Sequence, residues 1–320
     1  MDRIVPVAIG LPVYNGEKSL AQSIESVLAQ DFGDFDFLIS DNCSTDSTWE
    51  ICNHYASKDK RIRLNRFKKN FGCIRNFNSV LNNTKSKYFM WHAHDDLLDS
   101  QYVGKCHRFL EENDDYALCC TKVIRLDKDI KPLSLCRINE ERAENGVLER
   151  IEKYWANGAY TECIYGLIRR HVLDRIGDLP LTPMFSDLIL VSEIILHGKV
   201  HQIDEFLRHR SLPTGPKAVL LNFKNHGPQT CLGTRLPISV LPFTKLYTAF
   251  ASRIDRVPSL SREEKLRIKQ IAKSSIVKGS LLETDARHYF WVIRTYFTTY
   301  WNIFCISMRE LFTAKPSING

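Results

Sequence analysis

The first hundred residues alternate between short apolar runs and amphipathic segments, and this alternation restricts the fold more than any other feature of the chain. Residues 4–11 form a nearly all-apolar run, and FDFLISD, RIRLNRF and YFMWHA follow it at intervals. Between these runs lie segments such as SLAQSIESVLAQ, in which Leu20, Ile24 and Leu28 have helical spacing. Strands that alternate with helices form parallel sheets with crossover helices. The sequence therefore predicts an α/β fold with a mainly parallel sheet flanked by helices.

Polar side chains follow each of the four predicted strands. In chain order they are Asn15, Asp41, Asn70 and the pair Asp95-Asp96. Ligands of open α/β sheets bind beyond the carboxyl ends of the strands. We therefore expect these side chains to meet in one crevice, although neither GxGxxG nor GxxxxGK[ST] occurs in the chain.

The pattern divides the chain into three parts. Residues 1–105 carry the regular alternation, and residues 106–215 mix helical and strand-like runs less regularly. From about residue 216, NFKNHGPQTCLGTRLP is rich in turn formers, and SREE at 261–264 has the spacing of a helix-capping box. We expect two halves of one domain, followed by a helical extension over 216–320.

Composition limits the class of protein. The 320 residues are 44% hydrophobic, enough for a sizeable core, and the net charge is +7. This moderately basic balance suits an anionic ligand or membrane surface rather than a nucleic acid. The ten cysteines are scattered without a CxxC pair, which argues for a reducing, cytoplasmic compartment. The first apolar run is short and broken by Pro6 and Pro12, so we expect a strand rather than a signal peptide, and we expect no transmembrane helix.

The stretch HAHDD after the fourth predicted strand has three interpretations. Asp95 and Asp96 are hard oxygen ligands that suit Mg²⁺ or Mn²⁺ carrying a phosphate-bearing ligand. They are also residues that favour the first turn of a helix. Read as His92, His94 and Asp96, the stretch resembles the HxHxDH zinc motif of metallo-β-lactamase-like hydrolases, but Leu97 occupies the final histidine position. We favour structural hydrogen bonds for the two histidines.

Several motifs in order resemble family 2 glycosyltransferases of the GT-A fold. They are PVYNGEKSLAQSIESVLAQ, DFLISDNCSTDST, NFGCIRNFN and YFMWHAHDDLL, within a resemblance that covers residues 4–215. Members of that family are inverting enzymes with nucleotide-sugar donors. The resemblance implies a nucleobase contact at Asp41 and further nucleotide contacts at Pro12, Tyr14 and Asn15.

The resemblance also implies a metal site and a catalytic base. The family's metal motif is Asp-x-Asp, often followed by another Asp; here Ala93 stands first, and the motif reads Ala-His-Asp-Asp. We assign Asp96 as the ligand of Mg²⁺ or Mn²⁺ and Asp95 as a sugar or ribose contact. The base falls on Asp187 in FSDLIL, a residue that otherwise suits a helix N-cap.

Three arginines complete the predicted site. The basic strand DEFLRHR offers Arg208 or Arg210 to the donor diphosphate, and Arg75 in CIRN is a weaker candidate. Each arginine of that strand is equally typical of a solvated strand edge.

The function that the resemblance implies is sugar transfer to a glycan or lipid-linked acceptor in cell-surface polysaccharide or glycolipid synthesis. A metal-dependent hydrolase and a non-catalytic sugar-nucleotide binder, the latter suggested by Ala93, remain as alternatives. The aromatic stripe within 290–312 predicts either a core helix or a peripheral contact with the inner face of the cell membrane.

Overall fold

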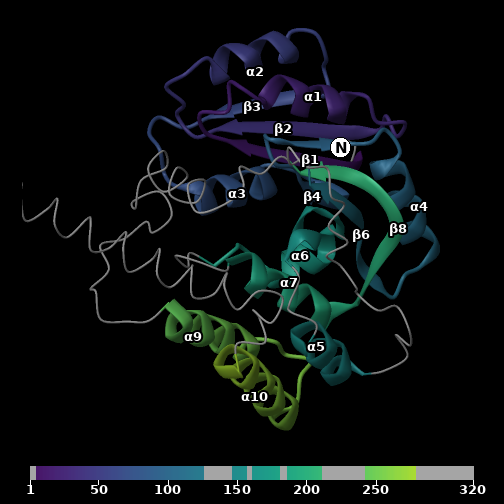
Figure 1. Cartoon of the computed structure of the whole chain (residues 1–320), viewed down its shortest axis with the longest axis vertical. Coiled ribbons are helices and arrows are strands. Elements are labelled where there is room, and N and C mark those ends of the chain that lie inside the picture. The colour runs from purple at the N-terminus through teal and green to yellow at the C-terminus, as the bar shows by residue number, and fades with distance from the viewer. Residues whose placement is uncertain (1–4, 126–145, 157–160, 181–185, 211–241, 279–320) are drawn as a thin grey trace, which may run out of the picture.

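The computed structural model describes residues 5–125, 146–156, 161–180, 186–210 and 242–278 (Figure 1). The aromatic stripe within 290–312 and the turn-rich segment NFKNHGPQTCLGTRLP therefore lie outside the described residues.

One eight-stranded sheet organises these residues, in the order β3-β2-β1-β4-β7-β6-β8-β5. The strands are β1 (Val5–Val13), β2 (Phe35–Asp41), β3 (Ile62–Arg66), β4 (Ser86–Trp91), β5 (Asp96–Leu98), β6 (Tyr116–Arg125), β7 (Leu167–Arg169) and β8 (Lys199–Arg210). The four strands of the first half are mutually parallel, whereas β7 and β5 run antiparallel to their neighbours. Because β7 reverses the direction between β4 and β6, the strands β6 and β8 again run with β4. The carboxyl ends of β1 to β4, β6 and β8 therefore share one edge.

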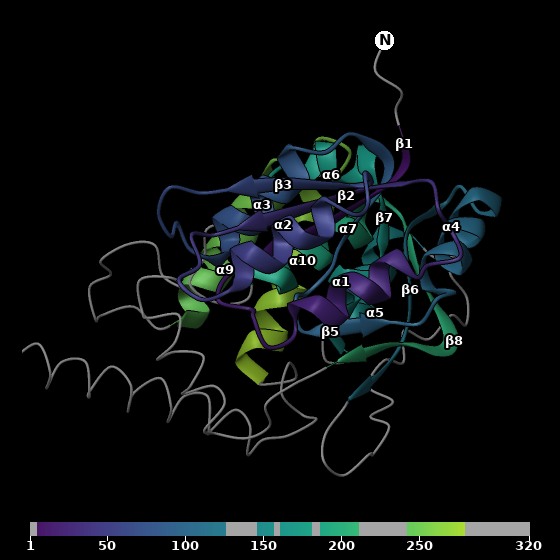
Figure 2. The ribbon, with the colours of Figure 1, turned by 90° about the horizontal axis from the view of Figure 1, so that it is seen from above.

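Helices cover both faces of the sheet. They are α1 (Leu20–Leu28), α2 (Thr48–Ala56), α3 (Cys73–Asn82), α4 (Tyr102–Glu112), α5 (Val147–Ala156), α6 (Arg170–Ile176), α7 (Ser186–His197), α9 (Pro242–Asp255) and α10 (Arg262–Lys278), with a 3-10 turn η1 (Glu162–Tyr165). Figure 1 shows α1 and α2 on one side of the sheet and α3 on the other, and Figure 2 shows α1 and α2 lying over the strands from above. One apolar core joins the sheet to α1, α2 and α4, and a second joins it to α3, α5, α6 and α7.

Helix α7 is buried on nearly all sides. Its sequence SDLILVSEIILH is apolar around most of the helix, which is typical of a helix inside a core. Its buried acid, Glu193, lies 2.5 Å from Arg253 of α9. The helix that begins with Ser186 and Asp187 is thus fixed from several sides.

Helices α9 and α10 share the second apolar core. Phe250 of α9 contacts Trp155 of α5 edge to face, with ring centroids 5.5 Å apart. The capping box predicted at the start of α10 is confirmed: Ser261 N–H donates to Glu264 Oε2 over 2.8 Å, and Glu264 N–H donates to Ser261 Oγ over 3.2 Å. Among the helices of the described ranges, none combines the length and apolar character needed to cross a bilayer.

The predicted, mainly parallel sheet is confirmed, and the structure adds three features that were not predicted. Strands β5 and β7 run antiparallel to their neighbours, and with three residues each they are too short to leave a pattern in the sequence. Helix α5 was not predicted. Pro12 lies inside β1 rather than in the loop, paired with Ser40 of β2. Backbone groups of successive strand residues point to alternate sides, and those of Pro12 point toward the β4 side. Because β4 ends opposite Gly10, the missing N–H of Pro12 costs no hydrogen bond between strands.

Candidate functional site

The loops that follow β1 and β2 are tied together by hydrogen bonds. Asn15, with φ of 53°, receives the Thr45 N–H on its Oδ1 over 2.9 Å and donates its own N–H to Ser44 Oγ over 2.9 Å. Gly16 N–H donates to Thr48 Oγ1 over 2.8 Å. Asparagine tolerates this left-handed conformation better than most residues, which explains its place at the sharp turn. The two loops form one rigid unit.

The loops after β3 and β4 join the same unit. Asn42 Nδ2 donates to Asn70 Oδ1 over 2.9 Å, and Phe71 N–H donates to Asn42 Oδ1 over 2.9 Å. On the other side, a Cβ atom at Gly16 would lie 2.7 Å from His94 Cδ2, so only glycine permits this approach. The structure therefore brings together the four strand ends, as the strand pattern predicted.

Asp41 is the most enclosed acid of this unit. Its side chain is 0% exposed, and its Oδ1 accepts from Ser44 N–H over 3.0 Å and from Ser44 Oγ–H over 2.5 Å. Its Oδ2 lies 3.0 Å from Arg66 Nε, but the angle gives no hydrogen bond, and this oxygen is buried without a hydrogen-bond partner. Buried polar atoms are nearly always hydrogen-bonded, so Oδ2 is suited to accept from a ligand N–H.

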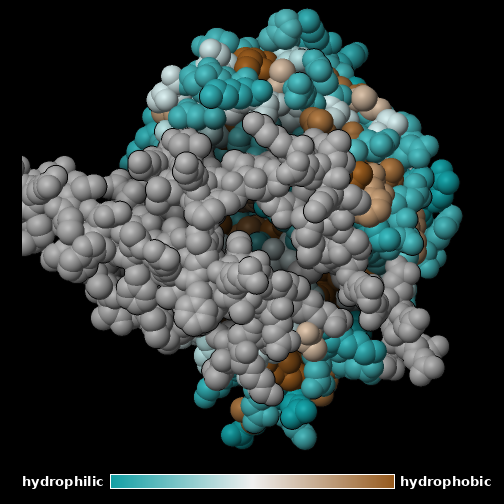
Figure 3. All heavy atoms as spheres, in the orientation of Figure 1, coloured by the Kyte–Doolittle hydropathy of each residue, from teal (hydrophilic) through white to brown (hydrophobic). Residues whose placement is uncertain are grey.

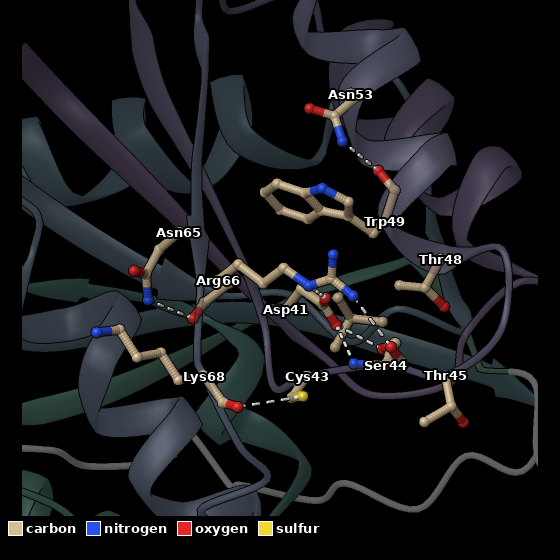
Figure 4. A network of polar contacts seen from close by, with 12 residues as sticks. Asp41, Cys43, Ser44, Thr45, Thr48, Trp49, Asn53, Asn65, Arg66 and Lys68 are labelled. Carbon is tan, nitrogen blue, oxygen red and sulfur yellow. Dashed lines mark hydrogen bonds and ion pairs between the residues drawn. The ribbon is translucent and has the colours of Figure 1, made fainter.

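Arg66 and Trp49 form a layer over Asp41. The guanidinium carbon of Arg66 lies 4.9 Å from the centroid of the Trp49 ring, and its Nη2 donates to Ser44 O over 3.2 Å (Figure 4). The Arg66 side chain is 38% exposed. Sequence reasoning missed both residues, although an arginine at the carboxyl end of RIRLNRF carries the same signal as Asp41 at the end of FDFLISD.

A second aspartate–arginine pair lies at the same edge of the sheet. Arg208 donates from Nε over 3.0 Å and from Nη2 over 2.5 Å to Asp96 Oδ2. Its guanidinium also lies 3.1 Å from Glu162 Oε2 and 4.1 Å from the centroid of the Tyr165 ring. Burial acts to lower the pKa of Arg208, but the neighbouring Asp96 raises it above its usual value.

This pair changes the interpretation of two predicted residues. Arg208 was expected to face a diphosphate, but its side chain is 2% exposed and enclosed by protein groups. Asp96 was expected to bind the metal, but one of its oxygens already holds Arg208. Arg210, at the next outward position of β8, forms an ion pair with Glu162.

Asp95 is the acid beside this buried pair. Its side chain is half-buried, and burial raises its pKa; His94 and Arg210 lower it, and Asp96 raises it further. A carboxylate that burial makes costly to ionise is stabilised by a nearby cation.

The histidines of HAHDD do not point to zinc. His92 is buried, and its Nε2 lies 2.9 Å from Ser23 Oγ of α1, which in turn donates to Ala93 O over 3.0 Å. Burial lowers the pKa of His92 to about 4. No group of three His, Cys, Asp or Glu side chains in the described ranges could hold a metal ion. This supports the structural role for His92, and the hydrolase hypothesis finds no ligand set there.

Asp187 begins α7 and is half-buried, with its Oδ1 2.9 Å from the Leu188 N–H. It lies within electrostatic reach of Tyr165, as do Asp95 and Asp96. Burial is the main reason that the pKa of Tyr165 is raised, and the three acids raise it further. Tyr165, which sequence reasoning missed, is therefore close to the charges of all three acids.

The remaining predicted residues lie around the first unit. Pro12 is buried at the end of β1, Tyr14 is half-buried just after it, and Arg75 is exposed in the first turn of α3. The guanidinium of Arg75 lies 5.8 Å from the centroid of the Phe71 ring. Their predicted contacts with a nucleotide stay predictions.

Curated proteins are similar in sequence to part of this chain. A putative glycosyltransferase EpsE of Bacillus subtilis (strain 168) is 31% identical over 38% of this chain and 44% of its own length. An uncharacterized glycosyltransferase of Haemophilus influenzae is 29% identical over 45% of this chain and 62% of its own length. The chain thus spans less than two thirds of these curated relatives.

Solved structures share the fold. S. aureus TarS 1–349 in complex with UDP-GlcNAc superposes with a TM-score of 0.64 at 17% identity, over 84% of this chain and 72% of that one. The mannosyltransferase PcManGT from Pyrobaculum calidifontis, in complex with GDP-Man and Mn²⁺, gives 0.50 at 11% identity, over 89% of each chain. The mixed, helix-flanked sheet is therefore of the GT-A kind. The model of Glycosyl transferase family 2 matches residues 8–177, more than half of the sequence, and the chain belongs to this family.

Proposed function

We propose that the protein transfers a sugar from a nucleotide-diphosphate sugar to an acceptor hydroxyl, with inversion at the anomeric carbon. The observation that carries the proposal is the buried Asp41 Oδ2, which lacks a hydrogen bond at the carboxyl edge of a family 2 fold. The likeness to proteins solved with UDP-GlcNAc and GDP-Man supports a nucleotide-sugar donor.

The donor would bind across the unit formed by the loops after β1 to β4. Asp41 Oδ2 accepts from an N–H of the base, and Tyr14 and Asn15, with Pro12 behind them, lie beside the nucleotide. Arg75 and Arg210 are the proposed contacts of the diphosphate, because Arg208 is enclosed. In this arrangement Arg66 leaves the Asp41 Oδ2 or shares it with the base.

The acids after β4 fit a divalent cation that arrives with the donor. Mg²⁺ and Mn²⁺ bind nucleotide diphosphates with only one or two protein carboxylates, so a large protein ligand set is not needed. The half-buried Asp95 has the raised pKa of an acid that a cation would relieve. Asp96, the first candidate from the sequence, can offer at most the oxygen that does not hold Arg208. The ion would offset charge on the leaving diphosphate.

Asp187 is the proposed general base. Its carboxylate takes the proton from the acceptor hydroxyl, whose oxygen then attacks the anomeric carbon from the face opposite the nucleoside diphosphate. A base must lie within hydrogen-bond reach of the proton that it removes. Asp187 lies in the first turn of α7. The apolar core and the Glu193–Arg253 pair hold this helix in place, so the backbone that carries the Asp187 carboxylate is fixed.

The acceptor is proposed from the family alone: a glycan or lipid-linked hydroxyl in cell-surface polysaccharide or glycolipid synthesis, at a cytoplasmic site. A non-catalytic sugar-nucleotide binder is the competing function, since Ala93 replaces the first Asp of the family motif.

The test compares the wild type with Asp187→Asn. Nucleoside diphosphate release from UDP-, GDP- and dTDP-sugars with Mn²⁺ measures turnover, and a thermal shift measures nucleotide binding. We expect one nucleotide to raise the melting temperature of both proteins. We expect turnover to fall by about 10²–10⁴-fold in the variant, the usual contribution of a general base.

Asp204→Asn is the matched control, because the Asp204 side chain is 82% exposed. It should retain full turnover. Full turnover in Asp187→Asn would remove that residue from the mechanism. Nucleotide binding without any turnover in the wild type would favour the non-catalytic binder.

A further inference from the structure

The net positive charge of the protein is concentrated in its last two described helices. Residues 242–278 contain nine lysine and arginine residues and three acidic residues, a net charge of +6, whereas the whole chain carries +7. All other residues together are therefore close to neutral. The basic balance of the sequence belongs to α9 and α10 and not to the proposed donor site.

Part of this charge is used inside the protein. Arg253 pairs with Glu193 of α7 and donates to the Ile176 and Asp178 carbonyls over 2.8 and 2.9 Å. Lys269 Nζ lies 2.5 Å from Asp255 Oδ1, and Lys265 Nζ donates to Asp255 O over 3.0 Å. These contacts fix α9 and α10 to the domain and to each other.

Several of the remaining cations are exposed, and the acid Glu263 is exposed beside them. Arg256, Arg262, Arg267 and Lys273 are all exposed to solvent. At 100° per residue, Arg262 and Lys273 lie within about 40° of Leu266 around the axis of α10. Ile268, Ile271 and Ala272 face the core on the opposite side.

Leu266 distinguishes this surface from an ordinary solvated helix face. Its side chain is 53% exposed, and it is the one large hydrophobic residue among those described that is exposed to this extent. The lowest part of the molecule, where Figure 1 places α10, shows mainly hydrophilic residues with a few hydrophobic ones between them (Figure 3). An apolar side chain between cations suits the boundary between lipid head groups and acyl chains.

We propose that α10 lies flat on an anionic lipid bilayer, with Arg262, Leu266 and Lys273 toward the head groups and Arg267 at the edge of that face. The acidic lipid head groups supply the complementary charge, and Leu266 enters the interface. The helix does not span the bilayer, since its opposite face is occupied by the core of the domain. This contact differs from the one predicted for 290–312, and it does not depend on the proposed transfer reaction.

The test is sedimentation of the full chain with vesicles of phosphatidylcholine, with and without phosphatidylglycerol. We expect binding only to the anionic vesicles, and weaker binding as salt is raised. The triple variant Arg262→Gln, Arg267→Gln, Lys273→Gln should bind about a hundredfold more weakly, from about fivefold for each cation. Leu266→Ser should lose roughly tenfold.

The matched control removes three exposed cations elsewhere, with Lys58→Gln, Lys60→Gln and Lys85→Gln. It should bind vesicles as the wild type does, and equal melting temperatures would show that all variants fold. Equal losses in both triple variants, or equal binding to neutral vesicles, would overturn the proposal.

A polyanion is the competing partner. Unchanged vesicle binding in Leu266→Ser, together with tighter binding of an RNA oligonucleotide through the same cations, would assign the surface to a nucleic acid and overturn the proposal. Because no sugar donor is present, vesicle binding and sugar transfer can each fail without the other.

Discussion

Two aspartate–arginine pairs lie at the carboxyl edge of the sheet, Asp41–Arg66 and Asp96–Arg208. Asp41 ends β2, Asp96 begins β5, and both side chains are buried. The arginines differ: the Arg66 side chain is 38% exposed, whereas that of Arg208 is 2% exposed. The residue types are the same, but Arg66 ends β3 and Arg208 lies inside β8, so the two guanidinium groups have different surroundings.

Hydrogen bonding follows this difference. Asp96 Oδ2 receives two N–H groups of Arg208, and Glu162 and Tyr165 enclose the guanidinium further. Asp41 Oδ2 has Arg66 at 3.0 Å but no hydrogen bond. Asp96–Arg208 is therefore the closed pair. Asp41–Arg66 is the open pair, and its free Oδ2 is the atom that we propose accepts a hydrogen bond from the ligand.

The largest expected effect comes from breaking the closed pair. Arg208→Met leaves the buried Asp96 without its cation, so the free energy of unfolding should fall by about 3–5 kcal/mol. Arg66→Met removes a partly exposed partner and should cost about 1 kcal/mol or less. Urea unfolding of both variants measures the contrast. Equal losses in the two variants would show that exposure of the arginine does not separate the pairs.

His92 is buried shortly before Asp96 in the chain, and its contribution to the free energy of unfolding depends on pH. Its pKa is lowered by burial from 6.5 to about 4 in the folded state. Between these values the unfolded chain binds a proton that the folded protein does not, so stability falls as pH falls. From pH 7 to pH 4.5 the loss from this group is about 2–3 kcal/mol.

The measurement is urea unfolding of the wild type and His92→Gln at both pH values. The variant lacks this titration. At pH 7 we expect a lower free energy of unfolding for the variant than for the wild type, and this difference should be smaller by about 2–3 kcal/mol at pH 4.5. Other histidines are common to both proteins and cancel in the difference. A deficit that is the same at both pH values would mean that His92 titrates normally in the fold.

The comparison also shows which features could be predicted from sequence. The alternation of strands and helices predicted the parallel first half of the sheet and the meeting of its four strand ends. The capping box at Ser261 and Glu264 was predictable because its partners are three residues apart. These features could be predicted because each depends on residues that are close together in one segment of the sequence.

Pairings between distant segments were not predictable. Arg208 and Asp96 are 112 positions apart, and nothing in either segment shows that they meet. The sequence therefore assigned Arg208 to a ligand and Asp96 to a metal, and it missed Tyr165, which packs against Arg208. Strands β5 and β7 were too short to show a period. Arg66 was overlooked although it ends a predicted strand, as Asp41 does.

The smallest expected effect concerns the open pair and its ligand. Asp41→Asn keeps the size of the side chain but removes the charge that would accept a base N–H at Oδ2. Hydrogen bonds to charged groups contribute about 1.5–3 kcal/mol, so the dissociation constant of the nucleoside diphosphate should rise by about 10- to 100-fold. Calorimetric titration with the nucleotide selected by the thermal shift measures this change.

Asp36→Asn is a matched control, because Asp36 also pairs with an arginine from β3, Arg63, but lies away from the carboxyl end of β2. Its nucleotide affinity should equal that of the wild type. Arg66→Met separates two roles of the arginine: weaker binding would mean that Arg66 contacts the base, whereas tighter binding would mean that it competes for Asp41. Unchanged affinity in Asp41→Asn would show that the open oxygen has no part in donor binding, and the distinction between the two pairs would then be one of burial alone.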